Sequence, residues 1–278
     1  MPTSPLKAKD FSSMAAAFVM SVALSFIAPP SYAEQAASPE WQGIHKDVFG
    51  AREILDGAGK MTLDGPIRAE DAALVPLTVK IPASFANTVT KLTLVIDKNP
   101  SPVVGAFTYG AAAGKGDRML STRVRIDQYS DVRAIAETAD GKLYMVSRFI
   151  KASGGCSAPA SKDAEEALKT LGKMQIKTAL SKNSSGLSQE AQIMIKHPNN
   201  SGLAMDQLTG HYAPAHFVTK IEVKSGTNLV FAMEGGISIS EDPNLRFTYE
   251  GSPSDPMEVK AEDSEGGIYS GRSAASQS

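Results

Sequence analysis

The sequence predicts an all-β fold of two β-sandwich domains that a loop and a short helix join. Many short segments are rich in Val, Leu and Thr and are separated by turn signals, which is typical of sandwiches. One stretch of helix-forming composition interrupts this pattern after residue 159. Similar strand segments before and after that stretch indicate that the two domains are related.

Residues 1–33 have the features of a secretory signal peptide. Lys7 and Lys9 precede an apolar run over 14–28, and small residues up to Ala33 form a cleavage signal. The run is short for a bilayer-spanning helix, which needs roughly 20 apolar residues. We therefore expect cleavage after Ala33 and a periplasmic mature chain. An uncleaved membrane anchor is the alternative.

The charge balance bears on the class of partner. The whole chain has a formal charge of −2. Loss of residues 1–33 removes two lysines and one aspartate, which changes this charge to −3. A weakly acidic chain argues against a nucleic-acid partner. The length of the mature chain, residues 34–278, suggests two domains of about 100 residues each.

The first domain is expected over residues 34–159. Residues 41–55 have mixed helical spacing, and strands follow them. In the segment 89–96, apolar residues alternate with Lys91 and Thr93, which is typical of a half-buried strand. Asp140-Gly141 predicts a hairpin turn. The strands expected in this domain are 74–81, 89–96, 103–109, 120–126, 131–138 and 142–150.

The rest of the chain is expected to contain a linker, a second domain and a tail. Residues 160–188 are predicted to be a helical linker, with a helix over 160–178 because apolar residues recur there at helical spacing. The second sandwich is expected over 189–270, and residues 271–278 are predicted to be a disordered tail. The strands expected in this domain are 191–196, 217–223, 228–233, 237–239, 244–249 and 257–261.

Two pairs of segments suggest an internal repeat. The sequence VTKLTL at 89–94 is similar to VTKIEV at 218–223. The sequence AFTY at 106–109 is similar to RFTY at 246–249, and an Asx-Pro turn precedes each. Because the order is the same in both halves, we expect two sandwiches of one design.

Cys156 is the only cysteine and the main candidate for chemistry. In an oxidising compartment a lone cysteine is a buried inert residue, a point of intermolecular pairing or a reactive thiol. Gly154 and Gly155 precede it, and Pro159 ends the loop, so no bulky neighbour shields the sulfur. We therefore favour an exposed, functional thiol over an inert buried one and expect Cys156 to be a site of covalent attachment. Whether the sulfur is exposed at rest or sheltered between the two domains is left open by the sequence.

A thiol enzyme is an alternative use of the same residue. It requires a base, usually histidine, within hydrogen-bonding distance of the sulfur. The histidines are His45, His197, His211 and His216, and none of them is near Cys156 in the sequence. No catalytic residue is assigned on this basis.

No metal site or cofactor is predicted. His211 and His216 are five residues apart, which places them on one face of neither a strand nor a helix. Glu70 and Asp71 are adjacent, so a shared acid–base site is not expected, and we interpret them as a solvated turn or a partner surface.

Several segments resemble a known family. In the first half these are AEDAALVP at 69–76, VIDKNPSP at 95–102 and the Gly154-Gly155-Cys156 arm. They are similar to SoxY, the sulfur-carrying subunit of the periplasmic thiosulfate-oxidising system. The second half is similar to SoxZ, its partner. The matching segments there are KHP at 196–198 followed by Gly202, PAHF at 214–217 and SISEDP at 238–243.

The whole chain resembles the fused SoxY–SoxZ-type carriers that are associated with quinoprotein dehydrogenases. The resemblance implies two immunoglobulin-like sandwiches, and a cysteine on a glycine-rich arm that holds a sulfur group covalently while partner enzymes act on it. Cys156 matches that cysteine, and Gly154 and Gly155 match the glycines before it. In the separate subunit the chain ends at the arm, whereas here Ser157-Ala158-Pro159 follow. The arm is therefore tied at both ends.

The resemblance implies that the protein is a carrier and not an enzyme. The expected partners are periplasmic redox or hydrolytic enzymes of sulfur oxidation, with a quinoprotein dehydrogenase as a further candidate. The alternative is a non-catalytic accessory or binding module for a periplasmic quinoprotein dehydrogenase, which needs no thiol chemistry.

Overall fold

The computed structural model describes residues 1–2, 38–159, 164–183, 186–205, 210–252 and 254–273. Residues 38–278 form one unit. The predicted signal peptide lies outside the described residues, apart from residues 1–2. In the described part of the chain, no helix is both long and apolar enough to cross a bilayer.

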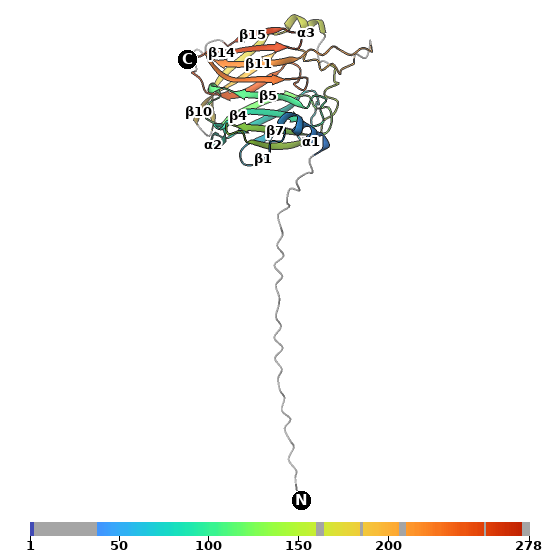
Figure 1. Cartoon of the computed structure of the whole chain (residues 1–278), viewed down its shortest axis with the longest axis vertical. Helices are drawn as coiled ribbons and strands as arrows, with labels where there is room; N and C mark the ends of the chain where they lie inside the picture. Colours follow the sequence, from blue (N-terminus) through green and yellow to red (C-terminus); the bar gives the residue numbers. More distant parts are fainter. Residues whose placement is uncertain (3–37, 160–163, 184–185, 206–209, 253, 274–278) are drawn as a thin grey trace. The chain divides into compact units, whose positions relative to one another are not determined.

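Two β-sheets form the fold, and both run through the first and second halves of the sequence (Figure 1). The first sheet has nine strands in the order β1-β8-β7-β4-β5-β12-β11-β14-β15. Their bounds are Ile54–Asp56 (β1), Leu143–Ile150 (β8), Ser130–Thr138 (β7), Val89–Ile96 (β4), Val103–Tyr109 (β5), Asn228–Gly235 (β12), Val218–Ser225 (β11), Met257–Asp263 (β14) and Ile268–Arg272 (β15).

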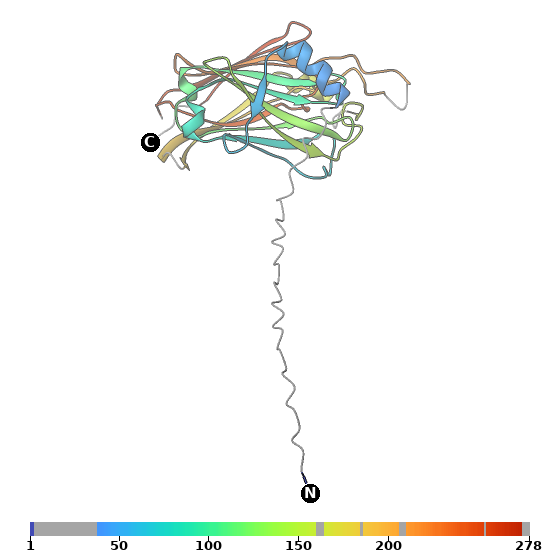
Figure 2. The same ribbon diagram turned by 60° about the horizontal axis from the view of Figure 1, so that its bottom comes forward.

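The second sheet has six strands in the order β2-β3-β6-β13-β10-β9. Their bounds are Thr62–Asp64 (β2), Val75–Ile81 (β3), Arg118–Val124 (β6), Asn244–Tyr249 (β13), Gly186–Ile195 (β10) and Met174–Asn183 (β9). The two sheets lie as separate layers, which Figure 2 shows. The all-β sandwich class predicted from the sequence is confirmed.

The strand order is the same in the two halves. The set β8-β7-β4-β5 in the first half corresponds to β15-β14-β11-β12 in the second, and β2-β3-β6 corresponds to β9-β10-β13. The halves meet through two antiparallel pairs, β5 with β12 and β6 with β13. The repeat is therefore real, and each sheet continues from one half into the other.

Only one of the two sequence similarities follows this repeat. The segments 89–94 and 218–223 lie in β4 and β11, which occupy equivalent places in the nine-stranded sheet. The segments 106–109 and 246–249 lie in β5 and β13, which belong to different sheets. The Phe-Thr-Tyr similarity was therefore a wrong alignment, because strands of similar burial share composition without sharing a position.

The core between the sheets joins both halves. The rings of Phe107 and Phe231 pack in a T-shaped arrangement with centroids 5.7 Å apart, and Phe231 packs in the same way on Phe247 at 4.9 Å. All three side chains are buried. Phe107 and Phe231 lie on the paired strands β5 and β12, whereas Phe231 and Phe247 lie on different sheets of the second half, so these contacts stabilise both the junction and the packing of the two sheets.

A second apolar cluster covers the outer face of the nine-stranded sheet. It contains Trp41 and Phe49, from α1 (Pro39–Ile44) and the π-helical turn after it (His45–Phe49), together with Val95 and Ile135 from the sheet. β4 is therefore buried on both faces, not half-buried as the alternation predicted. The predicted helical stretch 41–55 also ends early, because Ile54–Asp56 is β1 and pairs with β8.

The predicted helical linker 160–188 is wrong beyond its first part. The helix α3 covers only Ala164–Thr170. Gly172, with a φ of +75°, lies between α3 and β9, and β9 pairs with β10 along its whole length. Met174 follows Leu171 at the helical spacing that suggested a longer helix, but it packs on the core from a strand, together with Ile176.

The predicted tail also begins too early. Residues 271–273 lie within the described part of the chain, and β15 extends to Arg272 in antiparallel pairing with β14. Residues 274–278 lie outside the described residues. The expected strand 237–239 is a turn whose residue Ile239 makes one isolated bridge to Val124. The remaining short elements are α2 (Ala83–Ala86) and a 3-10 turn (Ala111–Ala113).

Candidate functional site

Cys156 lies in a turn after β8, and its side chain is buried, with an exposed fraction of 0%. We call residues 153–158 the cysteine arm. The exposure that the flanking glycines favoured was wrong for this arrangement, and of the two resting states that the sequence left open the sulfur occupies the sheltered one. Its two preceding glycines leave the sulfur unshielded in an extended chain, but they also let the arm pack closely against the body of the protein.

The backbone of the cysteine arm is hydrogen-bonded to the residues that follow β6. The N–H of Gly154 donates to the carbonyl oxygen of Asp127 at 2.8 Å, and the N–H of Gly155 donates to that of Ile126 at 3.0 Å. At Gly155 a Cβ atom would lie 2.1 Å from the carbonyl oxygen of Ala72. Glycine is therefore required at 155 for close approach, while Gly154 has a φ of +80° that favours glycine for conformational reasons.

Segments 69–76 and 95–102 of the first half meet around this arm. The carbonyl oxygen of Ala72 accepts the N–H of Ile126 at 2.8 Å. The buried Asn99 side chain donates to the carbonyl oxygen of Arg125 at 2.7 Å and accepts the N–H of Asp127 at 2.9 Å. These contacts fix the strand end on which the cysteine arm lies.

The second half covers the arm. The Ser201 hydroxyl donates to the carbonyl oxygen of Cys156 at 2.5 Å. Asn199 is fully buried, with a φ of 47°, and its side chain donates to the carbonyl oxygen of Ile239 at 3.0 Å and accepts the N–H of Val218 at 2.9 Å.

The segment 238–243 completes this junction. The Ser238 hydroxyl accepts from Asn99 and donates to the carbonyl oxygen of Ser101 at 2.6 Å. The Ser240 hydroxyl donates to the carbonyl oxygen of Ala73 at 2.7 Å. The segments that carried the family resemblance in the two halves therefore come together around Cys156.

One buried cation lies beside the arm. Arg125 is 3% exposed, and its guanidinium donates to the carbonyl oxygens of Gly155 at 3.2 Å and Asn199 at 3.4 Å. Burial lowers the pKa of Arg125, and the charges of Glu241, Cys156 and Asp71 oppose that effect.

The thiol is held in its neutral form. Burial, and after it the Asp127 carboxylate, raise the pKa of Cys156 to about 12, while the Arg125 guanidinium opposes both effects. Since the thiolate is the nucleophile, Cys156 is a weak nucleophile at neutral pH while the arm is packed in this position.

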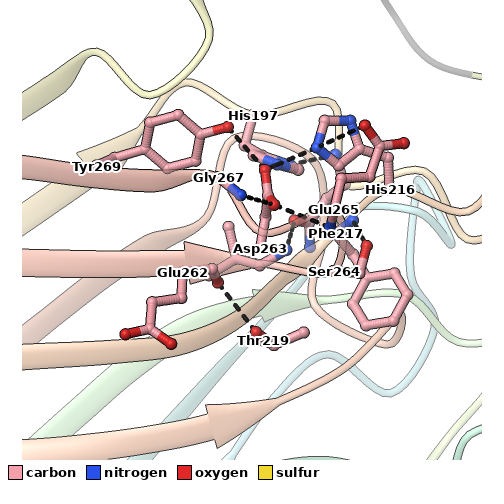
Figure 3. Close-up of polar contacts among 12 residues, drawn as sticks. His197, His216, Phe217, Thr219, Glu262, Asp263, Ser264, Glu265, Gly267 and Tyr269 are labelled. Atoms are coloured by element: carbon pink, nitrogen blue, oxygen red, sulfur yellow. Dashed lines mark hydrogen bonds and ion pairs between the residues drawn. The ribbon is translucent and has the colours of Figure 1, made fainter.

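A buried hydrogen-bonded cluster joins His197 and His216 to the end of β14 (Figure 3). Asp263, at the end of β14, accepts from the Tyr269 hydroxyl and from His216 Nε2, each at 2.7 Å, and from the N–H groups of Glu265 and Gly267. Burial would raise the pKa of Asp263, but these hydrogen bonds hold it well below its usual range.

His197 is the second histidine of this cluster. Its Nδ1 accepts the N–H of Asn199 at 3.0 Å, so the neutral ring carries its proton on Nε2, which lies 3.5 Å from the Asp263 carboxylate. Burial and the neighbouring His216 lower the pKa of His197 to about 4. His197 is therefore neutral at neutral pH.

Three atoms of this cluster suit a metal by type. One atom each from His197, His216 and Asp263 lie within 4.8 Å of one another. A metal on Nε2 of His197 would need that nitrogen to be free of its proton, and the Asn199 N–H on Nδ1 holds the proton there. We therefore assign no metal to this cluster and interpret it as a structural clasp.

The sequence did not predict this cluster. From the sequence, His216 was considered as a possible metal ligand together with His211. The structure instead places His216 beside His197, with ring centroids 4.6 Å apart. The cluster therefore fixes His197, which lies four residues before Ser201, the residue whose hydroxyl bonds to the cysteine arm.

The acidic pair has the role expected of a turn. Glu70 and Asp71 are exposed, and the Asp71 carboxylate accepts the N–H of Ala73 at 2.8 Å.

Comparisons with known proteins divide the chain into the same two halves. A family model described as sulfur oxidation protein SoxY matches residues 45–156, and one described as sulphur oxidation protein SoxZ matches residues 173–274. The SoxY match ends at Cys156. No curated protein matches the chain.

Two similar solved structures illustrate the range of the likeness. The sulfur carrier protein SoxY from Chlorobium limicola f thiosulfatophilum is 23% identical, with a TM-score of 0.34 over 42% of this chain and 94% of that one. The glucan-utilisation protein SGBP-B from Bacteroides ovatus, solved with a mixed-linkage heptasaccharide, is 9% identical, with a TM-score of 0.21 over 75% of this chain and 66% of that one.

The family assignment rests on the two family models, which together match more than half of the chain in tandem. The strand repeat agrees with that division, since each matched region contains one copy of the repeated strand set. The chain belongs to the SoxY and SoxZ families of sulfur oxidation proteins, as a SoxY domain and a SoxZ domain fused in one polypeptide.

Proposed function

We propose that this protein carries a sulfur-containing group covalently on Cys156 and presents it to partner enzymes of sulfur oxidation. The carried group would be an adduct such as a persulfide or an S-sulfonate. One partner would load the thiol, and another would oxidise or hydrolyse the bound group.

One observation carries this proposal. The only cysteine of the chain stands at the end of the SoxY match, and segments from both halves converge on it. A buried cysteine that serves only as a small apolar residue does not need a glycine pressed against a backbone carbonyl beside it. The close packing of the cysteine arm supports a sheltered thiol that is released when it is needed.

Carriage therefore requires that the arm open. In the closed arrangement the sulfur is out of contact with solvent, and its pKa of about 12 keeps it protonated. An open arm would restore a more ordinary thiol pKa and give a partner active site access to the sulfur. The thiol is then protected from unspecific oxidation between rounds of carriage.

The geometry also supports a carrier over a thiol enzyme. A catalytic thiol needs a neighbouring base or a lowered pKa, and here burial raises it. The groups whose charges act on the Cys156 thiol are Asp127 and Arg125, and no histidine is among them. The two buried histidines are hydrogen-bonded to Asp263.

The export signal extends the proposal to location and partners. We propose that the mature chain begins at Glu34 and works in the periplasm with redox or hydrolytic enzymes of sulfur oxidation. A quinoprotein dehydrogenase is a second candidate partner.

Intact-mass spectrometry of the protein purified from its native host tests this proposal. We expect a mature mass that starts at Glu34, with an added mass that a reducing agent removes and that peptide mapping places on Cys156. The Cys156→Ser variant, purified in the same way, should lack the added mass. A thiol that stays unmodified under every growth condition, including induction of the partner enzymes, would overturn carriage and favour the accessory-module function.

A further inference from the structure

We propose that Arg125 is the binding residue for the group on Cys156, and that its guanidinium holds the negative charge of an anionic oxo-sulfur adduct while the cysteine arm is docked. This inference rests on the proposed function. It adds that the docked arm binds a negatively charged adduct more tightly than a neutral adduct of similar length.

The first argument is the position of Arg125. It comes directly after the last residue of β6, and the next two residues, Ile126 and Asp127, accept the backbone hydrogen bonds of the cysteine arm. One guanidinium nitrogen donates to the carbonyl oxygen of Gly155, the residue just before the cysteine. The side chain is therefore aimed at the arm, and its charge acts on the Cys156 sulfur.

The second argument is the incomplete pairing of this cation. Arg125 is 3% exposed, and among the described residues it makes no ion pair within 4 Å. Its Nη atoms bond to two carbonyl oxygens at 3.2 and 3.4 Å, and its Nε has no hydrogen-bond partner there. A buried guanidinium without a direct counter-ion is costly, and an anion that reached it would offset that cost.

A comparison with Arg133 makes the point within the same protein. Arg133 is also buried, and its guanidinium binds the Asp97 carboxylate through two contacts of 2.8 and 2.7 Å. That pair is complete without a ligand. At Arg125 the corresponding carboxylate is missing, and the anion that would replace it is the adduct on Cys156.

The opposing charge near the thiol is Asp127, whose carboxylate raises the thiol pKa. At the Cys156 sulfur itself, Asp127 has the larger effect of the two charges. Asp127 is half-buried and Arg125 is buried, so solvent screens the carboxylate more, and the charge of an oxo-sulfur adduct lies on oxygens beyond the sulfur, where Arg125 would pair it. Asp71 and Glu241 also act on Arg125, but neither contacts its guanidinium within 4 Å in the described structure.

Two reagents load the thiol with groups that differ in charge and need no other oxidant. With tetrathionate, the Cys156 thiolate attacks a central sulfur, the central S–S bond breaks, thiosulfate leaves with the electron pair, and Cys–S–S–SO₃⁻ forms. With S-methyl methanethiosulfonate, the thiolate attacks the methylthio sulfur, methanesulfinate leaves, and neutral Cys–S–S–CH₃ forms. In both reactions the thiol proton goes to solvent.

The experiment measures how well the docked arm protects each adduct. The rate at which dithiothreitol removes the adduct from the full mature chain is divided by the rate in denaturant, which cancels the intrinsic reactivity of each disulfide. We expect wild type to protect the anionic adduct about tenfold better than the neutral one, which corresponds to about 1.4 kcal/mol. Arg125→Gln should reduce this preference to within about twofold, and Arg125→Lys should keep part of it.

Arg123→Gln is the matched control. It removes the same charge two residues away, where the guanidinium contacts the carbonyl oxygen of Asp242 and not the cysteine arm. It should keep the wild-type preference. A preference that survives Arg125→Gln, or an anionic adduct that wild type protects no better than the neutral one, would overturn the role of Arg125.

These outcomes separate the inference from the function on which it rests. The wild-type comparison decides the role of Arg125 even if Arg125→Gln does not fold. Carriage itself is tested by the adduct found on protein from the native host. An adduct present there, together with no charge preference in vitro, would reject Arg125 and leave the carrier function standing.

Discussion

Replacement of Gly155 by alanine should release the cysteine arm. A Cβ atom at this position would lie 2.1 Å from the carbonyl oxygen of Ala72, 2.6 Å from its carbonyl carbon and 2.7 Å from the carbonyl oxygen of Ile126. All three are backbone atoms of the protein body, so no side-chain rotation relieves the overlap. The φ of Gly155 is not in the left-handed region, so alanine acts only through this contact.

The cost follows from the contacts that the arm would lose. Separation of residue 155 from the body breaks its N–H bond to Ile126 and the bond from Arg125 to its carbonyl oxygen. With alanine at 155 the docked arm either moves away and loses these two bonds, each worth about 1 kcal/mol, or stays in place and accepts an overpacking strain of about 1–3 kcal/mol. A shift of about 2–3 kcal/mol in the docking equilibrium raises the population of the open arm by about 30- to 150-fold.

The assay is thiol labelling in native conditions. Cys156 is the only cysteine, so the rate of reaction with a neutral maleimide reports the opening of this arm alone. We expect Gly155→Ala to label about 30- to 150-fold faster than wild type. Gly43→Ala is the control, because nothing lies within 4 Å of its added Cβ atom and its rate should match wild type.

Labelling at the wild-type rate in a folded Gly155→Ala protein would refute this reasoning. It would mean that the body of the protein adjusts around the new methyl group and that docking does not depend on the glycine. An opening free energy equal to the global unfolding free energy would also refute it, since the arm would then open only with the whole fold.

Three further predictions concern stability. Between pH 9 and about pH 12 the native state keeps the Cys156 proton that the unfolded chain releases, so the free energy of unfolding should fall with rising pH, and less so in Cys156→Ser. Between about pH 6.5 and 4 the unfolded chain binds a proton that buried His197 does not, so stability should fall by up to about 3 kcal/mol as pH falls, and His197→Gln should show a smaller slope in urea titrations. Asp97→Asn leaves the buried Arg133 without its carboxylate and should cost about 3–5 kcal/mol by urea denaturation, whereas Asp140→Asn, at an exposed ion pair that solvent screens, should leave the urea midpoint nearly unchanged.

The fold class and most strands could be predicted from the sequence, because hydrophobic alternation and turn residues act locally. The predicted bounds of 89–96, 103–109 and 244–249 are confirmed, and Gly141, with a φ of +81°, lies in the predicted hairpin turn. The helix predicted over 174–178 was wrong because Met174 fits both patterns: it continues the helical spacing of Leu171, and it shares one face of a strand with Ile176. Pairing with β10, which lies far along the chain, decides between the two.

The site could be predicted only in part. Cys156 and its glycines were identifiable from residue type, and their role as an attachment site stays a prediction. Burial of the sulfur was not identifiable, because it depends on Ala72, Ile126 and Ser201, which approach from distant parts of the sequence. The clasp around Asp263 was missed for the same reason, since no local pattern relates that residue to two histidines.

The junction between the halves also has a consequence for folding and aggregation during synthesis. Either half by itself would present two unpaired edge strands, β5 and β6 in one case and β12 and β13 in the other, with open N–H and C=O groups. Such edges pair readily with strands of other molecules. During synthesis the first half is complete before β12 and β13, the strands that pair with its edges, have been made. Fusion fixes the stoichiometry at one to one and supplies the correct edge at high local concentration, which favours closure within the chain over aggregation between chains.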